Sequence, residues 1–574
     1  MMAWLLRASP ASVSSGDGFD LFPGWSGLRA PPDRPGDRDR LECRRESFAV
    51  NTFRTEKDSM GTLNVPADAY YGAQTRRAEL NFQISSLRAP RALIRALGLI
   101  KKSAAQVNMD LGLLPEDLGV AIMRAAQGVA EGRFDDQFVV DVFQTGSGTS
   151  TNMNTNEVIA GIANEAQAGT RGGKSPVHPN DAVNMGQSSN DVYPTAIHVA
   201  ALEGLKKNLI PAFVRLRDAL ATKAKEFDAI VKIGRTHLQD AVPIRLGQEF
   251  SGFAGQIEHA IMRLEGCCDS LGELAIGGTA VGTGINTHAE FPERMTALLS
   301  QETGLSFRPA TNTFEAMANR DAAVATSAML KAAAVSLSNV ANNIRWLSSG
   351  PRCGIGEIQI PELQPGSSIM PGKVNPVIPE AVMMVAAQVV GADATIAWSN
   401  ALGSNFQLNV MMPVIAYNLL QSIDLLAAAA GHLNSKCLDA REFFASKEIK
   451  PPGVDHLLAD SRAADSIERS LAMCTALAPR IGYDNAAAIA KAAFKGRIAG
   501  KTLVREVALE LVGKTPEAVA ALLYPDDSDA KSRSQAVEIL VSKGGYPAAA
   551  EIDRLLDPMG QTIRGVGVGG SGGG

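Results

Sequence analysis

The chain has 574 residues, of which 45% are hydrophobic and 20% are charged, values typical of a globular protein. Its net charge of −5 gives no electrostatic basis for binding nucleic acid or an anionic membrane surface. The 6 cysteines include no Cys-x-x-Cys pair, so the sequence indicates neither a zinc site nor an iron–sulfur cluster. Few aromatic residues and abundant alanine favour closely packed helices over sheet.

The first 50 residues differ in composition from the remainder of the chain. Between Arg29 and Glu46, arginine alternates with acidic residues and prolines, a composition that cannot bury a core. The acidic residues also argue against a mitochondrial transit peptide. We therefore predict five regions along the chain. They are a disordered extension (1–50), an N-terminal domain (51–187), a central domain of long helices (188–444), a small C-terminal domain (445–559) and a flexible tail (560–574).

Residues 54–75 are mostly loop-like, and helical sequence begins near Arg91 and continues to about Val142, with a break at Gly112–Pro115. From Leu246 to Leu274 the apolar residues recur at spacings of 3 or 4, which predicts one buried stripe along a helix. Residues 152–166 also read as helix, and similar long tracts cover residues 197–227, 314–348, 379–398 and 406–434. Helices this long predict an all-α fold built on an elongated central bundle, with apolar surface partly covered by other subunits.

One uncharged run, from Thr395 to Ile423, is long enough to span a bilayer. Its many Ser, Asn and Gln residues argue instead for helices buried inside a soluble bundle, so we expect no membrane partner.

The segment Gly366–Pro376 reads Gly-Ser-Ser-Ile-Met-Pro-Gly-Lys-Val-Asn-Pro. Its two glycines and two prolines exclude regular helix, so it is a loop between rigid elements. Hydroxyl, ammonium and amide groups in such a loop suit an anionic ligand and a nucleophile or base.

Three further polar loops precede predicted helices or interrupt them. Gln144–Ser150 combines glycines with hydroxyls ahead of a helix, an arrangement that suits an anion. Gly186–Asp191 offers Ser and Asn donors, and Asp191 fits an N-terminal cap equally well. Gly234–Asp240 contains His237, whose imidazole exchanges protons near neutral pH.

All four loops resemble one family. The pattern Gly-Ser-Ser-x-Met-Pro-x-Lys-x-Asn is similar to the signature of the fumarase/aspartase superfamily, and from Phe53 to the 480s the chain resembles class II fumarate hydratases. The loops Thr145–Thr149 and Gly234–His237 resemble the fumarase form, because aspartases usually carry Gly-Ala-Gly in the first and Gln in place of His237. The sequence of residues Gly350–Ile358 also resembles that of fumarases.

The resemblance implies a role for each matching residue. It implies catalytic roles for His237, Ser367 and Glu380, with Ser367 as the base and His237 paired with Glu380. It implies that substrate is bound by Ser147, Gly148, Thr149, Ser188, Ser189, Asn190, Thr236, Ser368, Lys373, Val374 and Asn375. It also implies an accessory carboxylate site formed by His178, Pro179, Asn180 and Asp181.

The implied activity is the reversible hydration of fumarate to L-malate, a step of the tricarboxylic acid cycle, in a cytoplasmic homotetramer whose site forms where three subunits meet. Loss of a proton beside a carboxylate leaves a carbanion, which donors around that carboxylate stabilise. This chemistry requires no metal and no redox cofactor.

Two alternatives remain open. The first is an aspartate ammonia-lyase, against which His237 and Ser147 argue. The second is a catalytically silent bundle retained as a scaffold, against which the presence of every implied polar group argues.

Overall fold

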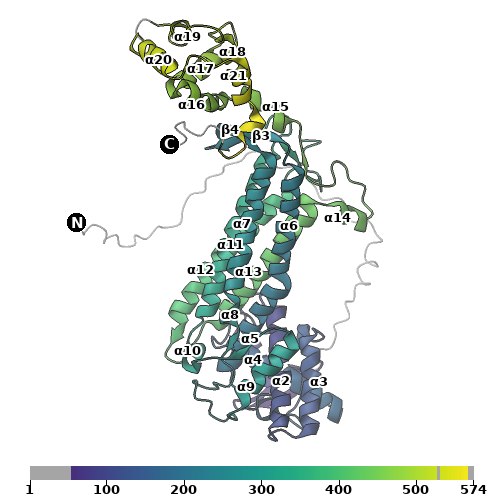
Figure 1. The fold of residues 1–574 in the computed structure, drawn as a ribbon. Coiled ribbons are helices and arrows are strands. Elements are labelled where there is room, and N and C mark those ends of the chain that lie inside the picture. Colours follow the sequence, from purple (N-terminus) through teal and green to yellow (C-terminus); the bar gives the residue numbers. More distant parts are fainter. Residues whose placement is uncertain (1–52, 527–529, 566–574) are drawn as a thin grey trace, which may run out of the picture. The chain divides into compact units, whose positions relative to one another are not determined.

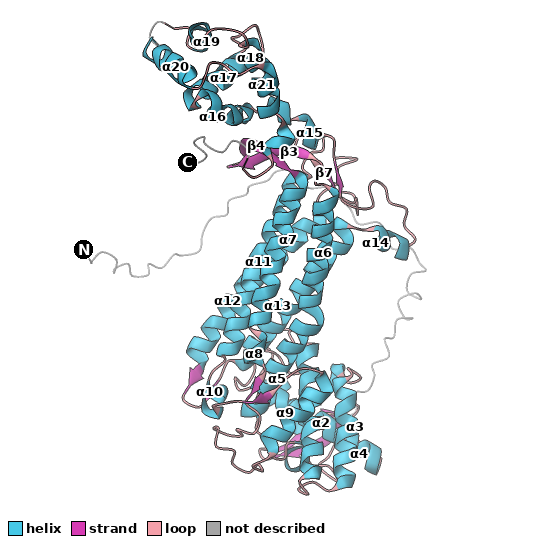
Figure 2. Cartoon of the chain, viewed as in Figure 1, coloured by secondary structure: helices cyan, strands magenta, loops and turns pink. Residues whose placement is uncertain are grey.

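The computed structural model describes residues 53–526 and 530–565. The extension expected over residues 1–50 lies outside the described residues, as do residues 566–574 of the expected tail. Helices dominate the part of the chain that the structure describes, and each of its sheets has only two strands (Figure 2).

The N-terminal region begins with a hairpin, because β1 (Phe53–Asp58) pairs antiparallel with β2 (Gly61–Pro66). Residues 54–75 were expected to be mostly loop, so the hairpin differs from that expectation. The helices that follow are α1 (Ala73–Asn81), α2 (Arg91–Asp110), α3 (Glu116–Ala130) and α4 (Thr149–Ala168). The predicted break between α2 and α3 is confirmed, but α3 ends at Ala130, twelve residues before Val142. A 3-10 turn (Asp135–Gln137) and chain without regular secondary structure follow it.

The central region is a bundle of long helices that run side by side (Figure 1). Its members are α5 (Ser189–Glu203), α6 (Ile210–Glu226), α7 (Leu246–Gly266), α11 (Asp321–Leu347), α12 (Val377–Gly403) and α13 (Met412–His432). Every apolar residue of the stripe predicted between Leu246 and Leu274 is buried, which confirms the stripe. The helix itself ends at Gly266, and a short α8 (Cys268–Leu271) continues the stripe.

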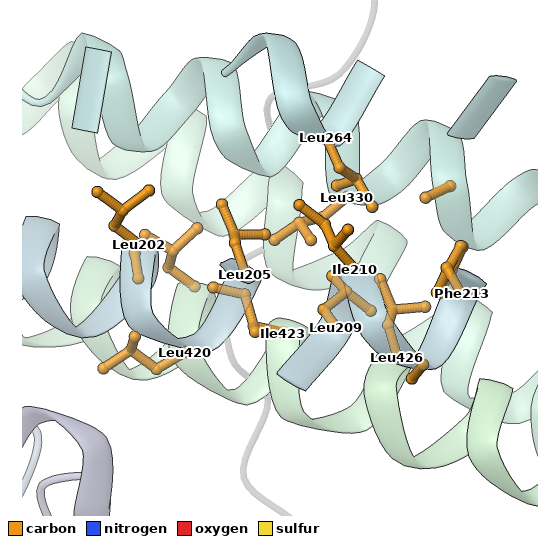
Figure 3. Close-up of a cluster of buried hydrophobic side chains, with 14 of the residues drawn as sticks. Leu202, Leu205, Leu209, Ile210, Phe213, Leu264, Leu330, Leu420, Ile423 and Leu426 are labelled. Carbon is orange, nitrogen blue, oxygen red and sulfur yellow. The ribbon is translucent and has the colours of Figure 1, made fainter. Parts of the chain in front are cut away.

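The core of the bundle is aliphatic. Figure 3 shows Leu205 and Leu209, from the turn Gly204–Leu209 that joins α5 to α6, facing Ile423 and Leu426 of α13. Each of these side chains is almost fully buried. Burying one leucine contributes about 2 kcal/mol, so this seam holds the helices in register along their length.

Small elements join the long helices. They are the hairpin β3 (Val231–Thr236) with β4 (Gln239–Arg245), the parallel pair β5 (Glu273–Leu274) with β6 (Arg308–Pro309), α9 (Phe291–Thr303), α10 (Thr313–Ala318), β7 (Ile358–Gln359), and the pair β8 (Ser404–Asn405) with β9 (Leu408–Asn409). Because β8 and β9 occupy residues 404–409, the predicted helix at 406–434 starts only at Met412.

The C-terminal region has a separate hydrophobic core. Its elements are α14 (Arg441–Ser446), β10 (Leu458–Ala459), α15 (Arg462–Asp465), α16 (Ala478–Ile481), α17 (Tyr483–Lys495), α18 (Val504–Glu510), α19 (Pro516–Leu523), α20 (Ala530–Ser542), α21 (Ala549–Leu555) and α22 (Pro558–Gln561). Residues 560–565 fall in the expected tail, yet Thr562 accepts a hydrogen bond from Arg245 at 2.8 Å and so joins this region to β4.

Three helical segments among the described residues are long and apolar enough to cross a membrane by length and composition alone. They are Asp321–Leu347, Val377–Gly403 and Met412–Leu438. The uncharged run from Thr395 to Ile423 is not one helix, because the β8–β9 pair divides it. Polar contacts also link the helices: Asp393 of α12 accepts hydrogen bonds from Ser327 and Lys331 of α11.

Candidate active site

The first cluster of predicted site residues lies where two helices begin. Ser147 and Gly148 precede α4, and Ser188 is the N-cap of α5. The hydroxyl of Thr149 lies 2.8 Å from that of Ser147 and 2.7 Å from that of Ser189, so one chain of hydroxyls links the two loops. Hydroxyls and free N–H groups at two helix N-termini form an environment that favours a carboxylate.

The position of the α5 N-terminus is fixed by a buried carboxylate. Asp191 accepts hydrogen bonds from the backbone N–H groups of Ser188, Gly277 and Thr279 at 2.9–3.0 Å. The Ser188–Asp191 pair forms a capping box, which confirms Asp191 as a cap residue. Burial raises the pKa of Asp191 to about 6, and the three N–H donors oppose that rise. The amide of Asn190 donates to the carbonyl of Ala280 at 2.8 Å, a second link to the same segment.

The second cluster is the loop Gly366–Pro376. The loop closes on itself at its neck, where the Gly366 N–H donates to the Lys373 carbonyl at 2.7 Å and the Asn375 amide donates to the Gly366 carbonyl at 2.8 Å. A Cβ at Gly366 would stand 2.7 Å from that Lys373 carbonyl oxygen, so glycine is required there. The Ser367 hydroxyl oxygen accepts hydrogen bonds from the N–H groups of Ile369 and Met370.

A cavity of about 780 Å³ adjoins this loop. Lys373, Val374, Asn375 and Glu380 line it, together with Arg345 and residues around Ser349 and Asp460. The cavity therefore collects four of the predicted site residues, from the loop and the first turn of α12. Ser368 and Lys373 are exposed to solvent, whereas Ser367 is half-buried.

His237 lies at the tip of a β-hairpin. Thr236 pairs with Gln239, which leaves His237 and Leu238 as a two-residue turn. Both have positive φ, 56° and 60°, an unusual conformation for a leucine. His237 is exposed, and the structure shows no hydrogen bond between His237 and Glu380 within the described residues of one chain.

The base of the hairpin is held by charge. Lys232, only 1% exposed, lies 3.0 Å from Glu357, and Arg235 donates to the same carboxylate at 2.8 Å. Glu357 directly precedes β7, whose Ile358 and Gln359 line the cavity. The hairpin and the cavity wall are thus fastened to each other.

The predicted accessory residues form a tight turn. His178 precedes a π-helical turn at Pro179–Val183, and its Nδ1 accepts hydrogen bonds from the N–H groups of Asn180 and Asp181. Asn180 and Asp181 are exposed. The four residues lie together, as their sequence positions require, but they do not line the large cavity.

Within one chain the two main clusters are far apart. The loop Gly366–Pro376 leads directly into the first residue of α12, whereas Gly146 lies at the far end of that helix, where its carbonyl accepts from the Met412 N–H. α12 has 27 residues, which corresponds to about 40 Å at 1.5 Å per residue. Figure 1 shows the same separation, with β3 and β4 at the opposite end of the bundle from the start of α5.

Sequence reasoning missed one residue beside the first cluster. Lys101 of α2 is fully buried, and its Nζ donates to Asn184 at 2.8 Å and to Gln187 at 3.0 Å. Burial lowers the pKa of Lys101 to about 7. A signal existed, because Lys101 falls on the same helical face as the apolar Leu97 and Ala104. Among the described residues, no group of three or more His, Cys, Asp or Glu side chains is placed to hold a metal ion.

Comparisons with known proteins show that this fold belongs to a lyase family. The Lyase family matches residues 61–391, and the family described as Fumarase C C-terminus matches residues 473–527. The chain is 52% identical over 478 residues to a class II fumarate hydratase of Neisseria meningitidis, covering 83% of this chain and 99% of the relative. It is 54% identical to one of Mycobacterium tuberculosis, covering 78% and 89%.

A solved structure agrees with these sequence comparisons. The crystal structure of a class II fumarase from Schistosoma mansoni has a TM-score of 0.77 and 34% identity to this chain, and the match covers 90% of this chain and 100% of that one. The chain belongs to the class II fumarate hydratase family.

Proposed function

We propose that this protein catalyses the reversible addition of water to fumarate, giving L-malate. The observation that carries the proposal is the linked hydroxyl chain of Ser147, Thr149 and Ser189 at two helix N-termini. This arrangement suits a carboxylate, and class II fumarate hydratases are the chain's relatives. A four-carbon dicarboxylate is the matching substrate class.

The chemistry depends on stabilising a carbanion. When malate loses the proton beside a carboxylate, the negative charge spreads onto that carboxylate. Donors already placed around it stabilise the transition state more than the ground state. We assign this role to residues of the first cluster together with Thr236, Lys373 and Asn375. Removing one such donor costs about 3 kcal/mol of transition-state stabilisation.

Ser367 is the proposed base. Its hydroxyl oxygen accepts two backbone N–H donors, at 3.3 and 3.1 Å, and hydrogen bonds of this kind favour the negatively charged form of an oxygen. The Lys373 ammonium in the same loop adds positive charge. On the opposite face of the substrate, His237 exchanges the proton of the water that adds or leaves, with Glu380 as its partner.

One chain cannot supply all of these groups to one ligand. A four-carbon dicarboxylate is far shorter than the roughly 40 Å of α12 that separates the two clusters. We therefore propose that several copies assemble as a homotetramer and that each site takes its clusters from different copies. Large apolar side chains exposed on α12, among them Met384 (67%) and Trp398 (67%), fit burial against other copies.

This assembly also accounts for the three long apolar helices without a membrane. Covered by other copies, their outer faces need no lipid, and the relatives are metabolic enzymes, so we propose a cytoplasmic location. We also propose that residues His178–Asp181 form an accessory site for a carboxylate.

The deciding experiment follows the absorbance of fumarate formed from L-malate and, separately, from L-aspartate, with a chelator present. We expect turnover of malate and none of aspartate. Fumarate formed only from aspartate would establish the ammonia-lyase alternative, and an intact but inactive tetramer would establish the scaffold.

The shared site has its own test. We expect Ser147→Ala and Ser367→Ala homotetramers each to be nearly inactive, and co-expression of the two chains to restore part of the activity, because some sites in the mixed tetramers receive both intact clusters. Co-expressed chains that form mixed tetramers without any recovery would refute a site shared between copies.

A further inference from the structure

Lys101 is an unusual residue to find in the interior of this protein. Its side chain is 0% exposed, and no described carboxylate lies within ion-pair distance of it, although Asp191 attracts it from farther away. Burying an ammonium without a salt-bridge partner is costly, and such groups are retained where they perform a task. Neighbouring Lys102 shows the ordinary arrangement, since it lies at the surface and pairs with Glu302 at 2.8 Å.

The two acceptors of Lys101 belong to the segment that leads into the first cluster. Asn184 and Gln187 each point their side-chain oxygen at the Lys101 Nζ. With the oxygens fixed, their NH2 groups face the backbone: Asn184 donates to the Gln187 carbonyl at 3.0 Å, and Gln187 donates to the Val183 carbonyl at 3.2 Å. The backbone immediately before Ser188 is thereby held in one conformation.

The hydrogen bonds of Asn184 also reach the helix that follows the other loop of the cluster. The Asn184 oxygen also accepts from Asn152 at 3.2 Å and from Asn156 at 3.1 Å, and both of these residues lie on α4. Asn152 stands one turn from Thr149, the first residue of that helix. One amide oxygen, oriented by Lys101, therefore joins the segment before Ser188 to the helix that presents Thr149.

We propose that Lys101 is a positioning residue, which acts through Asn184 and Gln187 to hold the Ser147–Thr149 and Ser188–Asn190 segments at the spacing that binds a substrate carboxylate. This inference rests on the proposed function for the identity of the ligand. Lysine suits the task because its Nζ carries at least two N–H donors whether or not it is charged, one for each amide oxygen, so it fixes the orientation of both amides. Lys101 does not touch the ligand.

The test measures binding apart from turnover. The probe is succinate, a four-carbon dicarboxylate without the reactive double bond, titrated calorimetrically into the full-length tetramer. We expect Lys101→Met to weaken succinate binding at least tenfold and to raise the KM for fumarate by a similar factor, while kcat falls less. Lys101→Gln keeps an amide donor and is expected to fall between Lys101→Met and wild type.

Lys223→Met is the matched control. Lys223 is also a buried lysine, 7% exposed, but it donates to the Leu457 carbonyl and to Glu226, away from the cluster. We expect its succinate affinity to stay within twofold of wild type. A folded, tetrameric Lys101→Met protein with wild-type affinity and KM would overturn the proposal, as would an equal loss of affinity in both variants.

Two further variants keep the proposal testable if Lys101→Met does not fold. Asn184→Ala and Gln187→Ala remove the groups through which Lys101 acts, and we expect each to weaken succinate binding severalfold; wild-type affinity in both would overturn the proposal. Failure of the proposed function is distinguishable, because a wild-type protein that leaves malate and fumarate unchanged refutes the function, whereas the effect of Lys101→Met on succinate binding tests the inference alone.

Discussion

The two halves of the proposed site are built in opposite ways. Around Ser188–Asn190 the polar groups bond to distant parts of the chain: Asp191 to the segment near Gly277, Asn190 to Ala280, and Thr149 to Ser189. In the loop Gly366–Pro376 the side-chain hydrogen bonds stay within the loop, and Ile369 is 83% exposed. One half is held rigid by its own chain, whereas the other lacks such support.

The difference indicates a division of labour. A carboxylate site gains affinity when its donors are fixed before the ligand arrives. A loop that carries a base must admit the substrate and then exclude water, which favours weak attachment to the rest of the fold. The hairpin tip at His237 belongs with the second half, because both of its turn residues are exposed.

The largest effect is expected from substitutions that remove the two proposed reactive groups. Ser367→Ala removes the proposed base, and His237→Asn removes the proton exchanger. Each is expected to lower kcat by about 10²–10⁴, the usual contribution of general acid–base catalysis. Because both side chains lie outside the hydrophobic cores, the melting temperature is expected to stay within a few degrees of wild type.

Steady-state assays and thermal melts of the purified tetramers check this prediction. Ser368→Ala, an exposed neighbour in the same loop, serves as a milder comparison. A Ser367→Ala or His237→Asn enzyme with wild-type turnover would contradict the assigned role.

The buried lysine beside the rigid half leads to a prediction about how the free energy of unfolding depends on pH. Burial lowers the pKa of Lys101 from 10.5 to about 7. Between pH 7 and pH 10.5 the unfolded chain holds a proton on this lysine that the folded chain lacks. The free energy of unfolding therefore rises with pH in this window, and the penalty is complete below pH 7. At about 1.4 kcal/mol per pKa unit, the window from about pH 7 to 10.5 is worth about 5 kcal/mol.

Lys101→Met removes this contribution, so we expect its free energy of unfolding to depend less steeply on pH than that of the wild type. Denaturant unfolding at pH 7, 8 and 9 measures the difference, with Lys223→Met as the control. Asp191 is the charged group that acts on Lys101, and because its pKa is about 6 it stays mostly ionised throughout this window. Parallel curves for wild type and Lys101→Met would show that the lysine is not desolvated.

The helices and their buried faces could largely be predicted from the sequence, because an α-helix repeats every 3.6 residues. The stripe from Leu246 to Leu274 predicted a helix and its buried face together. The hairpin that carries His237 was not predicted, because its turn lacks the Asn-Gly or Asp-Gly pair that marks a two-residue turn. Lys101 and Lys102 are adjacent lysines in one helix; Lys101 shares the apolar face of α2 with Leu97 and Ala104, but its full burial is seen only once α2 is packed against its neighbours.

The loops that carry the proposed site residues were predictable from the sequence, but the distance between these loops was not. Motif spacing placed Ser147, Ser188 and Lys373 in loops beside helices, which the structure confirms. No sequence pattern reports that α12 keeps two of these loops about 40 Å apart. That distance follows from the uninterrupted length of one helix, and it gives a physical reason for the shared site that the family resemblance only implied.

Amide hydrogen exchange compares the two halves directly. The N–H groups of Gly277 and Thr279, which donate to the buried Asp191, are expected to exchange at least a hundredfold more slowly than those around Ile369. Adding succinate is expected to slow exchange in the loop far more than near Gly277, because the rigid half is already ordered. Equal protection of both halves in the ligand-free tetramer would contradict the comparison.

The smallest predicted effect concerns the backbone of the hairpin tip. Leu238 has φ of 60° and is 64% exposed, so a bulky residue is held in a left-handed conformation without visible packing. Such a position costs about 1 kcal/mol, which glycine does not incur. Leu238→Gly is therefore expected to raise the free energy of unfolding by about 1 kcal/mol.

Leu238→Ala, which keeps a Cβ and hence the unfavourable φ, is the matched control and is expected to give no gain. Denaturant midpoints of the two variants decide the matter: equal midpoints would mean that the turn is unstrained. A gain in stability with Leu238→Gly that is accompanied by lower kcat would show that the enzyme retains the strained turn because it holds His237 in place.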